Sequence, residues 1–199
     1  QEANKVLVNE FGSTMYAVAK DVKLQVEFNP AKVQSYRLVG YETRILNDED
    51  FNDDTKDAGE MGAGHTVTAL YEIIPTGISG NIPGSIDPLK YQTETNMNTQ
   101  TSNSSELLTV KLRYKTPEEE KSKKIEKSVT DTDKDNVSPD FRFASAVAMF
   151  AQLLKDSDFK GEATYDKVIE TANKGLSFDP EGYRAEFVRL VQSAKGLNK

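Results

Sequence analysis

Residues 22–30 read VKLQVEFNP, and this stretch decides the fold class of the long first part of the chain. Apolar and polar side chains alternate along it, which is the period-two pattern of a strand with one face in a core and the other in water. The proline at its end stops the strand, because proline cannot donate to a sheet ladder. The side chains expected to be buried are Val22, Leu24, Val26 and Phe28, and those expected to face water are Lys23, Gln25, Glu27 and Asn29.

Further strand-like segments follow. VQSYRLVGYE at 33–42 and HTVTALYEII at 65–74 are rich in β-branched and aromatic residues, and residues 108–114 alternate again. A last strand is expected at about 125–130, whereas the Thr-, Asn- and Ser-rich segment at about 76–105 is expected to be a flexible loop. Because no helical pattern separates these strands, the sequence predicts an antiparallel β-sandwich rather than a parallel sheet.

Helical patterns flank the strands. Apolar residues at a helical spacing predict an N-terminal helix from about Glu2 to Lys20, interrupted by Gly12. After residue 136 three amphipathic helices are predicted, which must pack together or on the sheet because single short helices are marginal in water. Their start signals are Ser138-Pro139, Thr164 and Asp179-Pro180, and the second and third end near Gly175 and Gly196. Their expected apolar faces are Phe143, Val147, Phe150 and Leu154; Val168, Ile169, Ala172 and Leu176; and Tyr183, Phe187, Leu190, Val191 and Ala194.

The predicted fold class is therefore α+β, an antiparallel β-sandwich followed by a bundle of about three helices. We divide the chain into residues 1–20 as a terminal helix or connector, 21–135 as the sandwich and 136–199 as a helical subdomain.

Composition excludes several chemistries. The chain has 199 residues, a net charge of −7, a single histidine and no cysteine, so disulfides, thiolate catalysis, Cys-ligated zinc and multi-histidine metal sites are ruled out. The negative charge argues against a nucleic-acid partner, since phosphate binding needs a basic field. No apolar run is long enough for a transmembrane segment, and the N-terminus has no signal-peptide pattern. Because Gln1 stands where an initiator Met would, we expect a processed or truncated piece of a longer protein.

The densest charge feature is the acidic loop, residues 47–60 (NDEDFNDDTKDAGE). The functional interpretation is a patch for a basic partner or a Ca²⁺ loop. Because the spacing matches no known calcium loop, a solvated loop anchored to the core by Phe51 is favoured. No catalytic, cofactor or metal residues are assigned. The candidate interaction patch is Asp48, Glu49, Asp50, Phe51, Asp53, Asp54 and Asp57.

Other motifs are weaker. Residues 131–135 open like an EF-hand, but Asn136 and Arg142 stand where Gly and Glu are required, which favours a polar turn. His65 follows a Gly-Ala-Gly turn with no nucleophile context, so a turn leading into a strand is favoured over catalysis. The lysines from Lys111 to Lys127 alternate with glutamates and predict a solvated edge.

Long strings of this sequence resemble one family. They are KVLVNEFGSTMYAVAKDVKLQVEFNPAKVQSYRLVGYETRIL, EDFNDD, DAGEMGAGHTVTALYE, DPLKYQ, DFRFASAVAMFAQLLKDSDFKGEATYDKVIETANKGL and DPEGYRAEFVRLV. Together they are similar to the C-terminal region of bacterial von Willebrand factor type A (vWA) domain proteins of the YfbK type. The resemblance implies that a vWA domain, with its D-x-S-x-S adhesion site and divalent cation, precedes this region. The helix from about Glu2 to Gly12 would be the last helix of that domain.

The resemblance also implies a bacterial envelope location, periplasmic or lipid-anchored, with any membrane tether upstream of this chain. It carries over no catalytic residue and no metal ligand. We therefore expect a non-catalytic protein-interaction module, without a cofactor of its own, that positions an adhesion domain and binds a protein partner. The alternatives are a carboxylate-dependent hydrolase, which needs two facing carboxylates in a cleft, and a Ca²⁺-stabilised carbohydrate-binding sandwich acting on envelope polysaccharide.

Overall fold

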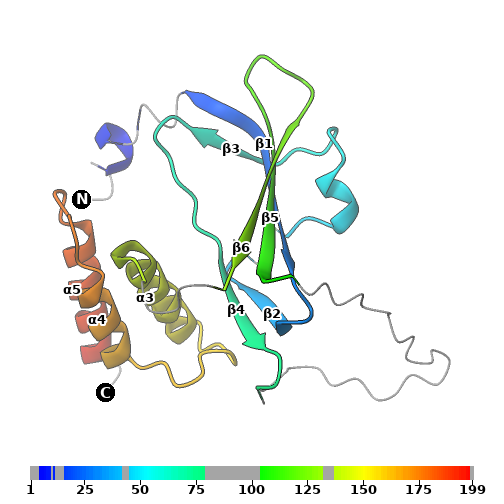
Figure 1. Ribbon diagram of the computed structural model, residues 1–199. Coiled ribbons are helices and arrows are strands. Elements are labelled where there is room, and N and C mark those ends of the chain that lie inside the picture. Colours follow the sequence, from blue (N-terminus) through cyan, green and yellow to red (C-terminus); the bar gives the residue numbers. More distant parts are fainter. Residues whose placement is uncertain are drawn as a thin grey trace. The chain divides into compact units, whose positions relative to one another are not determined.

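The computed structural model describes residues 5–9, 11, 16–41, 45–78, 104–131 and 137–197 (Figure 1). The chain divides into two compact units, residues 1–132 and residues 133–199. The first contains six antiparallel strands in two sheets and the second contains three helices. The predicted α+β class, with antiparallel sheets followed by a helical bundle, is confirmed.

The larger sheet has the strand order β3-β1-β5-β6, and the smaller sheet pairs β2 with β4. The strands are β1 (Ala17–Phe28), β2 (Val33–Val39), β3 (Gly59–Gly62), β4 (Leu70–Pro75), β5 (Glu106–Lys115) and β6 (Lys123–Thr130). A π-helical turn, η1 (Lys5–Asn9), precedes them, and a 3₁₀ turn, η3 (Asp48–Phe51), lies between β2 and β3. Figure 1 shows β1 (blue) beside β5 (green), which returns from far along the chain.

Aromatic side chains join the two sheets. The ring of Phe28, at the end of β1, lies 4.4 Å from the ring of Tyr36 on β2 and 5.5 Å from that of Tyr71 on β4, measured between centroids. Phe28 is buried, as predicted, and so is Val33 at the start of β2. A two-stranded sheet is only marginally stable by itself, so these contacts explain how it is held.

A β-bulge interrupts β1 at Asp21. Between the pairs Lys20–Lys115 and Lys23–Arg113, β1 has one residue more than β5, and Asp21 adopts a left-handed backbone with φ of 50°. Lys23 is only 3% exposed, whereas Leu24 is 44% exposed. The predicted faces of this strand are wrong at these two positions. Lys23 is buried because the acidic loop covers the face that the alternation assigned to water.

Three other expectations are corrected. The N-terminal helix does not reach Lys20, since Ala17–Lys20 already belong to β1 and pair with neighbouring strands. Residues 65–69 are not in a strand, and the short strand β3 (Gly59–Gly62) was not predicted. Most of the loop expected at 76–105, residues 79–103, lies outside the described residues.

The helical unit contains α3 (Pro139–Leu154), α4 (Tyr165–Lys174) and α5 (Tyr183–Leu197). The first two predicted caps are confirmed: Ser138 Oγ accepts a hydrogen bond from the Phe141 N–H at 3.1 Å, and Thr164 Oγ1 accepts one from the Lys167 N–H at 3.2 Å. The third helix begins later than predicted, at Tyr183. Asp179 still contributes to its first turn, because its carboxylate accepts from the Ala185 N–H at 3.0 Å.

The core of this unit is small and close-packed. Four residues that the helical spacing assigned to core faces are instead exposed, namely Val147, Leu154, Leu176 and Leu190. Gly175, directly after α4, is buried against α3: a Cβ placed there would lie 2.8 Å from the Phe143 nitrogen and 2.9 Å from the Pro139 oxygen. The buried residues are Ala146, Val168, Ala172, Val188 and Val191, with Phe143, Met149, Phe150, Leu153, Tyr165, Ile169 and Phe187 packed around them.

Candidate functional site

The acidic loop begins with the turn η3 and lies against the larger sheet. Phe51 is 6% exposed, which agrees with the anchoring role expected for it. The guanidinium carbon of Arg113, on β5, lies 5.7 Å from the centre of the Phe51 ring, in cation–π range. The loop is therefore attached to the sheet through an aromatic side chain at its first turn.

A buried lysine from β1 attaches the main chain of the loop. The ammonium group of Lys23 donates one hydrogen bond to the carbonyl oxygen of Asp50 at 3.0 Å and another to that of Asp53 at 2.5 Å. A buried ammonium group is costly unless it is hydrogen-bonded, and here main-chain carbonyls supply the acceptors. Lys23 thus holds both ends of the turn from Asp50 to Asp53.

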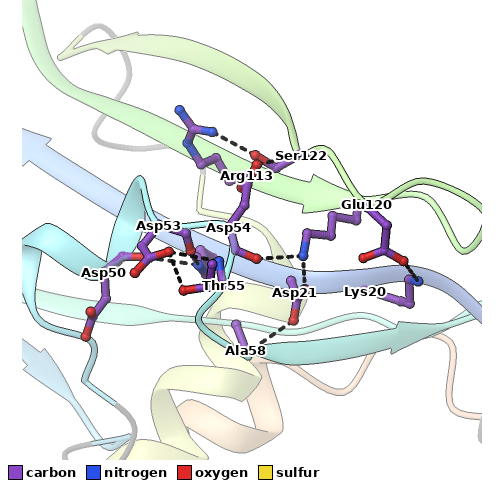
Figure 2. Close-up of polar contacts among 12 residues, drawn as sticks. Lys20, Asp21, Asp50, Asp53, Asp54, Thr55, Ala58, Arg113, Glu120 and Ser122 are labelled. Carbon is purple, nitrogen blue, oxygen red and sulfur yellow. Dashed lines mark hydrogen bonds and ion pairs between the residues drawn. The ribbon is translucent and has the colours of Figure 1, made fainter.

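A second buried lysine, Lys115 at the end of β5, acts on the next residue of the loop. Its ammonium group donates to the Asp54 carbonyl oxygen at 2.8 Å and lies 2.7 Å from Asp21 Oδ2 (Figure 2). Asp21 Oδ1 in turn accepts from the Ala58 N–H at 3.1 Å. The hydrogen bond from Lys115 lowers the pKa of Asp21, and the same bond raises the pKa of Lys115.

The carboxylates of Asp53 and Asp54 are also used inside the loop. Asp53 Oδ1 accepts from the Thr55 hydroxyl at 2.7 Å and from the Thr55 N–H at 2.8 Å, which lowers the pKa of Asp53. Asp54 Oδ2 accepts from the Ser122 N–H at 3.3 Å, and hydrogen bonding to Ser122 lowers the pKa of Asp54. Figure 2 shows Arg113 next to Ser122, whose hydroxyl accepts from that guanidinium at 2.7 Å.

The candidate patch therefore divides into two groups. Three of its acids, Asp48, Glu49 and Asp57, are exposed. The side chain of Asp50 is only 14% exposed and lies 3.8 Å from the Lys56 ammonium group. The residues whose side chains are buried or bonded within the protein are Asp50, Phe51, Asp53 and Asp54.

Among the residues that the structure describes, the other motifs gain no neighbouring group that would make them a catalytic or metal site. His65 is exposed at the end of a turn, and its main-chain N–H donates to the Gly62 carbonyl oxygen at 3.1 Å. Residues 132–136 of the EF-hand-like segment lie outside the described residues. Within the described ranges, no three His, Asp or Glu side chains are grouped so that they could hold a metal ion.

The lysines of β5 and β6 are largely matched by glutamates, as in the pairs Lys111–Glu27 at 2.7 Å and Lys124–Glu126 at 3.1 Å. The hydrogen bond that Lys111 donates to Glu27 raises the pKa of Lys111. Positive and negative side chains are therefore interleaved on these two strands.

Sequence reasoning missed Asp21, Lys23 and Lys115. Each occupies a polar position in an alternating strand, where a solvent-facing side chain is the ordinary expectation. The extra residue at Asp21 interrupts the ladder near all three, and this interruption becomes visible once the pairing of β1 with β5 is known.

Comparisons with known proteins agree over nearly the whole chain. The family described as "Uncharacterized protein YfbK, C-terminal" matches residues 13–197. The chain is 39% identical over 196 residues to the protein called "Uncharacterized protein YfbK" from Escherichia coli (strain K12); this covers 98% of the chain and 33% of that relative. The chain thus spans about a third of the relative's length. No solved structure matches.

None of the helices in the described parts of the chain combines the length and the apolar character needed to cross a membrane.

Proposed function

The chain belongs to the YfbK C-terminal family, and from this premise we propose that it is a non-catalytic protein-interaction module of a bacterial envelope protein of the vWA type. In this proposal the module positions an adhesion domain and binds a protein partner through the acidic loop. The module itself uses no cofactor. The divalent cation belongs to the preceding adhesion domain.

One observation supports the choice of the acidic loop as the surface that binds the partner. The main chain of the acidic loop is hydrogen-bonded to two buried lysines, while Asp48, Glu49 and Asp57 face solvent. Carboxylates on a fixed loop are presented to a basic partner with less loss of conformational entropy than carboxylates on a flexible one. Charge complementarity of this kind raises association rates and confers specificity.

The apolar N-terminal segment supports the link to a preceding domain. Val6, Leu7, Val8 and Phe11 are 44%, 68%, 66% and 55% exposed, and residues 1–12 precede the range that the family match covers. We propose that they pack against the preceding vWA domain. In a chain that includes the preceding domain, Leu7→Glu should make the junction more sensitive to protease, whereas Leu197→Glu, at an exposed leucine of α5, should not. Equal sensitivity of the two variants rejects this packing.

The envelope location and a tether upstream of the module are part of the same proposal and rest on the family resemblance. Fractionation of cells that make the full-length protein tests them. Recovery of the protein in the cytosolic fraction rejects the envelope location.

Partner capture tests the acidic loop. We would immobilise the chain and compare capture from an envelope extract by the wild type and by the triple variant Asp48→Asn, Glu49→Gln, Asp57→Asn. The control, Glu118→Gln, Asp158→Asn, Glu181→Gln, removes the same charge from exposed positions elsewhere.

The proposal expects the loop variant to lose capture and the salt dependence of capture, while the control retains both. Equal loss in the two triple variants would mean that net charge alone matters, and unchanged capture by the loop variant would remove the loop from the interaction. Release of soluble sugar from envelope polysaccharide by the purified chain would contradict a non-catalytic module.

A further inference from the structure

We propose that the acidic loop is organised by a cation that the protein itself supplies, the ammonium group of Lys23, and that this group occupies the position in which a loop of this kind would otherwise hold a metal ion. The proposal concerns how the loop is shaped and does not depend on whether the loop binds a partner.

The geometry around Lys23 carries the argument. Its ammonium nitrogen is shared by two main-chain carbonyl oxygens from one short turn, those of Asp50 and Asp53. Carbonyl oxygens converging on one point are what oxygen-ligand cations require, and the same convergence suits an ammonium group with its three donors. The side chain is 3% exposed, so this cation is internal.

The carbonyl group of Asp54, next to that of Asp53, also accepts a hydrogen bond from a buried lysine. The Asp54 oxygen accepts from Lys115, so the carbonyls of residues 50, 53 and 54 are all satisfied by lysines of the sheet. Lys23 therefore places a positive charge beneath a loop that carries many carboxylates, while the charge of Lys115 is shared with Asp21. The charge of Lys23 offsets the repulsion among those carboxylates, which would otherwise favour an open loop or an added cation.

Two expectations separate this arrangement from a calcium loop. The conformation of the wild-type loop should not respond to Ca²⁺, because the position among the carbonyls is filled. Lys23→Ala should loosen the loop, and n-propylammonium, which has the atoms that the substitution removes, should restore part of its order.

The experiment measures amide hydrogen exchange by mass spectrometry in the full chain. Peptides covering residues 48–58 report the loop, and peptides from α4 in the other unit report general effects. The control is Lys56→Ala, since Lys56 is in the same loop but its side chain is 56% exposed. We expect exchange in the loop to rise about tenfold or more in Lys23→Ala, the effect of losing hydrogen bonds to a charged group, with little change in Lys56→Ala or in α4.

Slower exchange with n-propylammonium but not with tetramethylammonium, which has no N–H to donate to the carbonyls, supports the proposal. Unchanged loop exchange in Lys23→Ala overturns it, and so does a failure of n-propylammonium to slow the faster exchange. If Lys23→Ala does not fold, the wild type still decides: loop exchange that is unaffected by Ca²⁺ supports an internal cation, and exchange slowed by Ca²⁺ overturns it. None of these measurements uses a partner, so their outcome is separate from that of the capture experiment.

Discussion

The ammonium nitrogen of Lys115 lies 2.7 Å from Asp21 Oδ2, and both side chains are largely buried, at 7% and 18% exposed. The pair links the end of β5 to the bulge of β1. Asp21 also accepts from the Ala58 N–H, so this one carboxylate connects two strands and the last part of the acidic loop.

Asp21→Asn should weaken the pH dependence of stability in acid. The pKa of Asp21 is lowered in the folded chain, so its carboxylate stabilises the fold above the ordinary carboxyl pKa of about 4, and this contribution is lost as pH falls through the lowered pKa. Asparagine tolerates the left-handed backbone at this position as aspartate does, so the substitution tests the charge rather than the turn. The measurement is urea unfolding at a series of pH values from neutral to acid. At each urea concentration, cleavage of the chain within β5 by a protease reports the unfolded fraction, which gives the free energy of unfolding.

The control for Asp21→Asn is Asp48→Asn, because the side chain of Asp48 is exposed. The free energy of unfolding should fall less steeply toward acid pH in Asp21→Asn than in the wild type, and Asp48→Asn should follow the wild type. Identical acid profiles for all three chains would show that the pair with Lys115 contributes nothing to the pH dependence.

Phe51→Ala should destabilise the first unit by about 3–5 kcal/mol, the usual cost of removing a buried phenylalanine ring. The matched control is Phe178→Ala, because Phe178 is 86% exposed and its replacement should change stability by less than about 0.5 kcal/mol. Urea unfolding of both variants measures the difference. A cost below about 1 kcal/mol for Phe51→Ala would mean that the ring does not anchor the acidic loop.

Gly175→Ala should destabilise the helical unit by about 1–3 kcal/mol, since the added methyl group would meet main-chain atoms of Pro139 and Phe143 at under 3 Å. Gly196→Ala is the control, because nothing lies within 4 Å of its Cβ position and alanine favours the helix. Thermal unfolding followed by helical circular dichroism measures both. A stabilised Gly175→Ala variant would contradict the close approach of α4 to α3.

Ser138→Ala should destabilise the helical unit by about 1 kcal/mol, because the Phe141 N–H loses its acceptor at the start of α3. Ser138→Asn keeps an acceptor at this position and should remain near the wild type. The same thermal unfolding experiment compares the two, and equal midpoints for the alanine and asparagine variants would show that the cap is dispensable.

Features that depend on nearby residues were predictable. Ser138 and Thr164 cap the helices they were expected to cap, since a cap needs only the first turn that follows it. Most strands were also predicted, because alternation is local. The start of β1 was not: Val18 fits a helical spacing, but pairing with β3 and β5 places it in a strand, and pairing is decided by distant residues.

For the candidate site, the sequence predicts the acidic residues of the loop but not the buried lysines that hold it. Its acidic residues stand together in the sequence, so the loop and the anchoring role of Phe51 could be proposed. The path of the loop's main chain depends on Lys23 and Lys115, which are distant in sequence. Alternation assigns Lys23 to solvent, and only the loop lying on that face makes it a buried donor.

The strand order also governs when the first unit can form. Glu27 on β1 contacts Lys111 on β5, 84 positions later, so a ribosome must release the intervening chain before the central pair of strands can close. Contacts between residues so far apart slow folding, whereas those of the helical unit are closer in sequence. Until β5 emerges, β1 can pair only with the short strand β3, and Arg113 and Lys115 are not yet available to hold the acidic loop. The acidic loop is therefore expected to be among the last parts of the first unit to acquire its final shape.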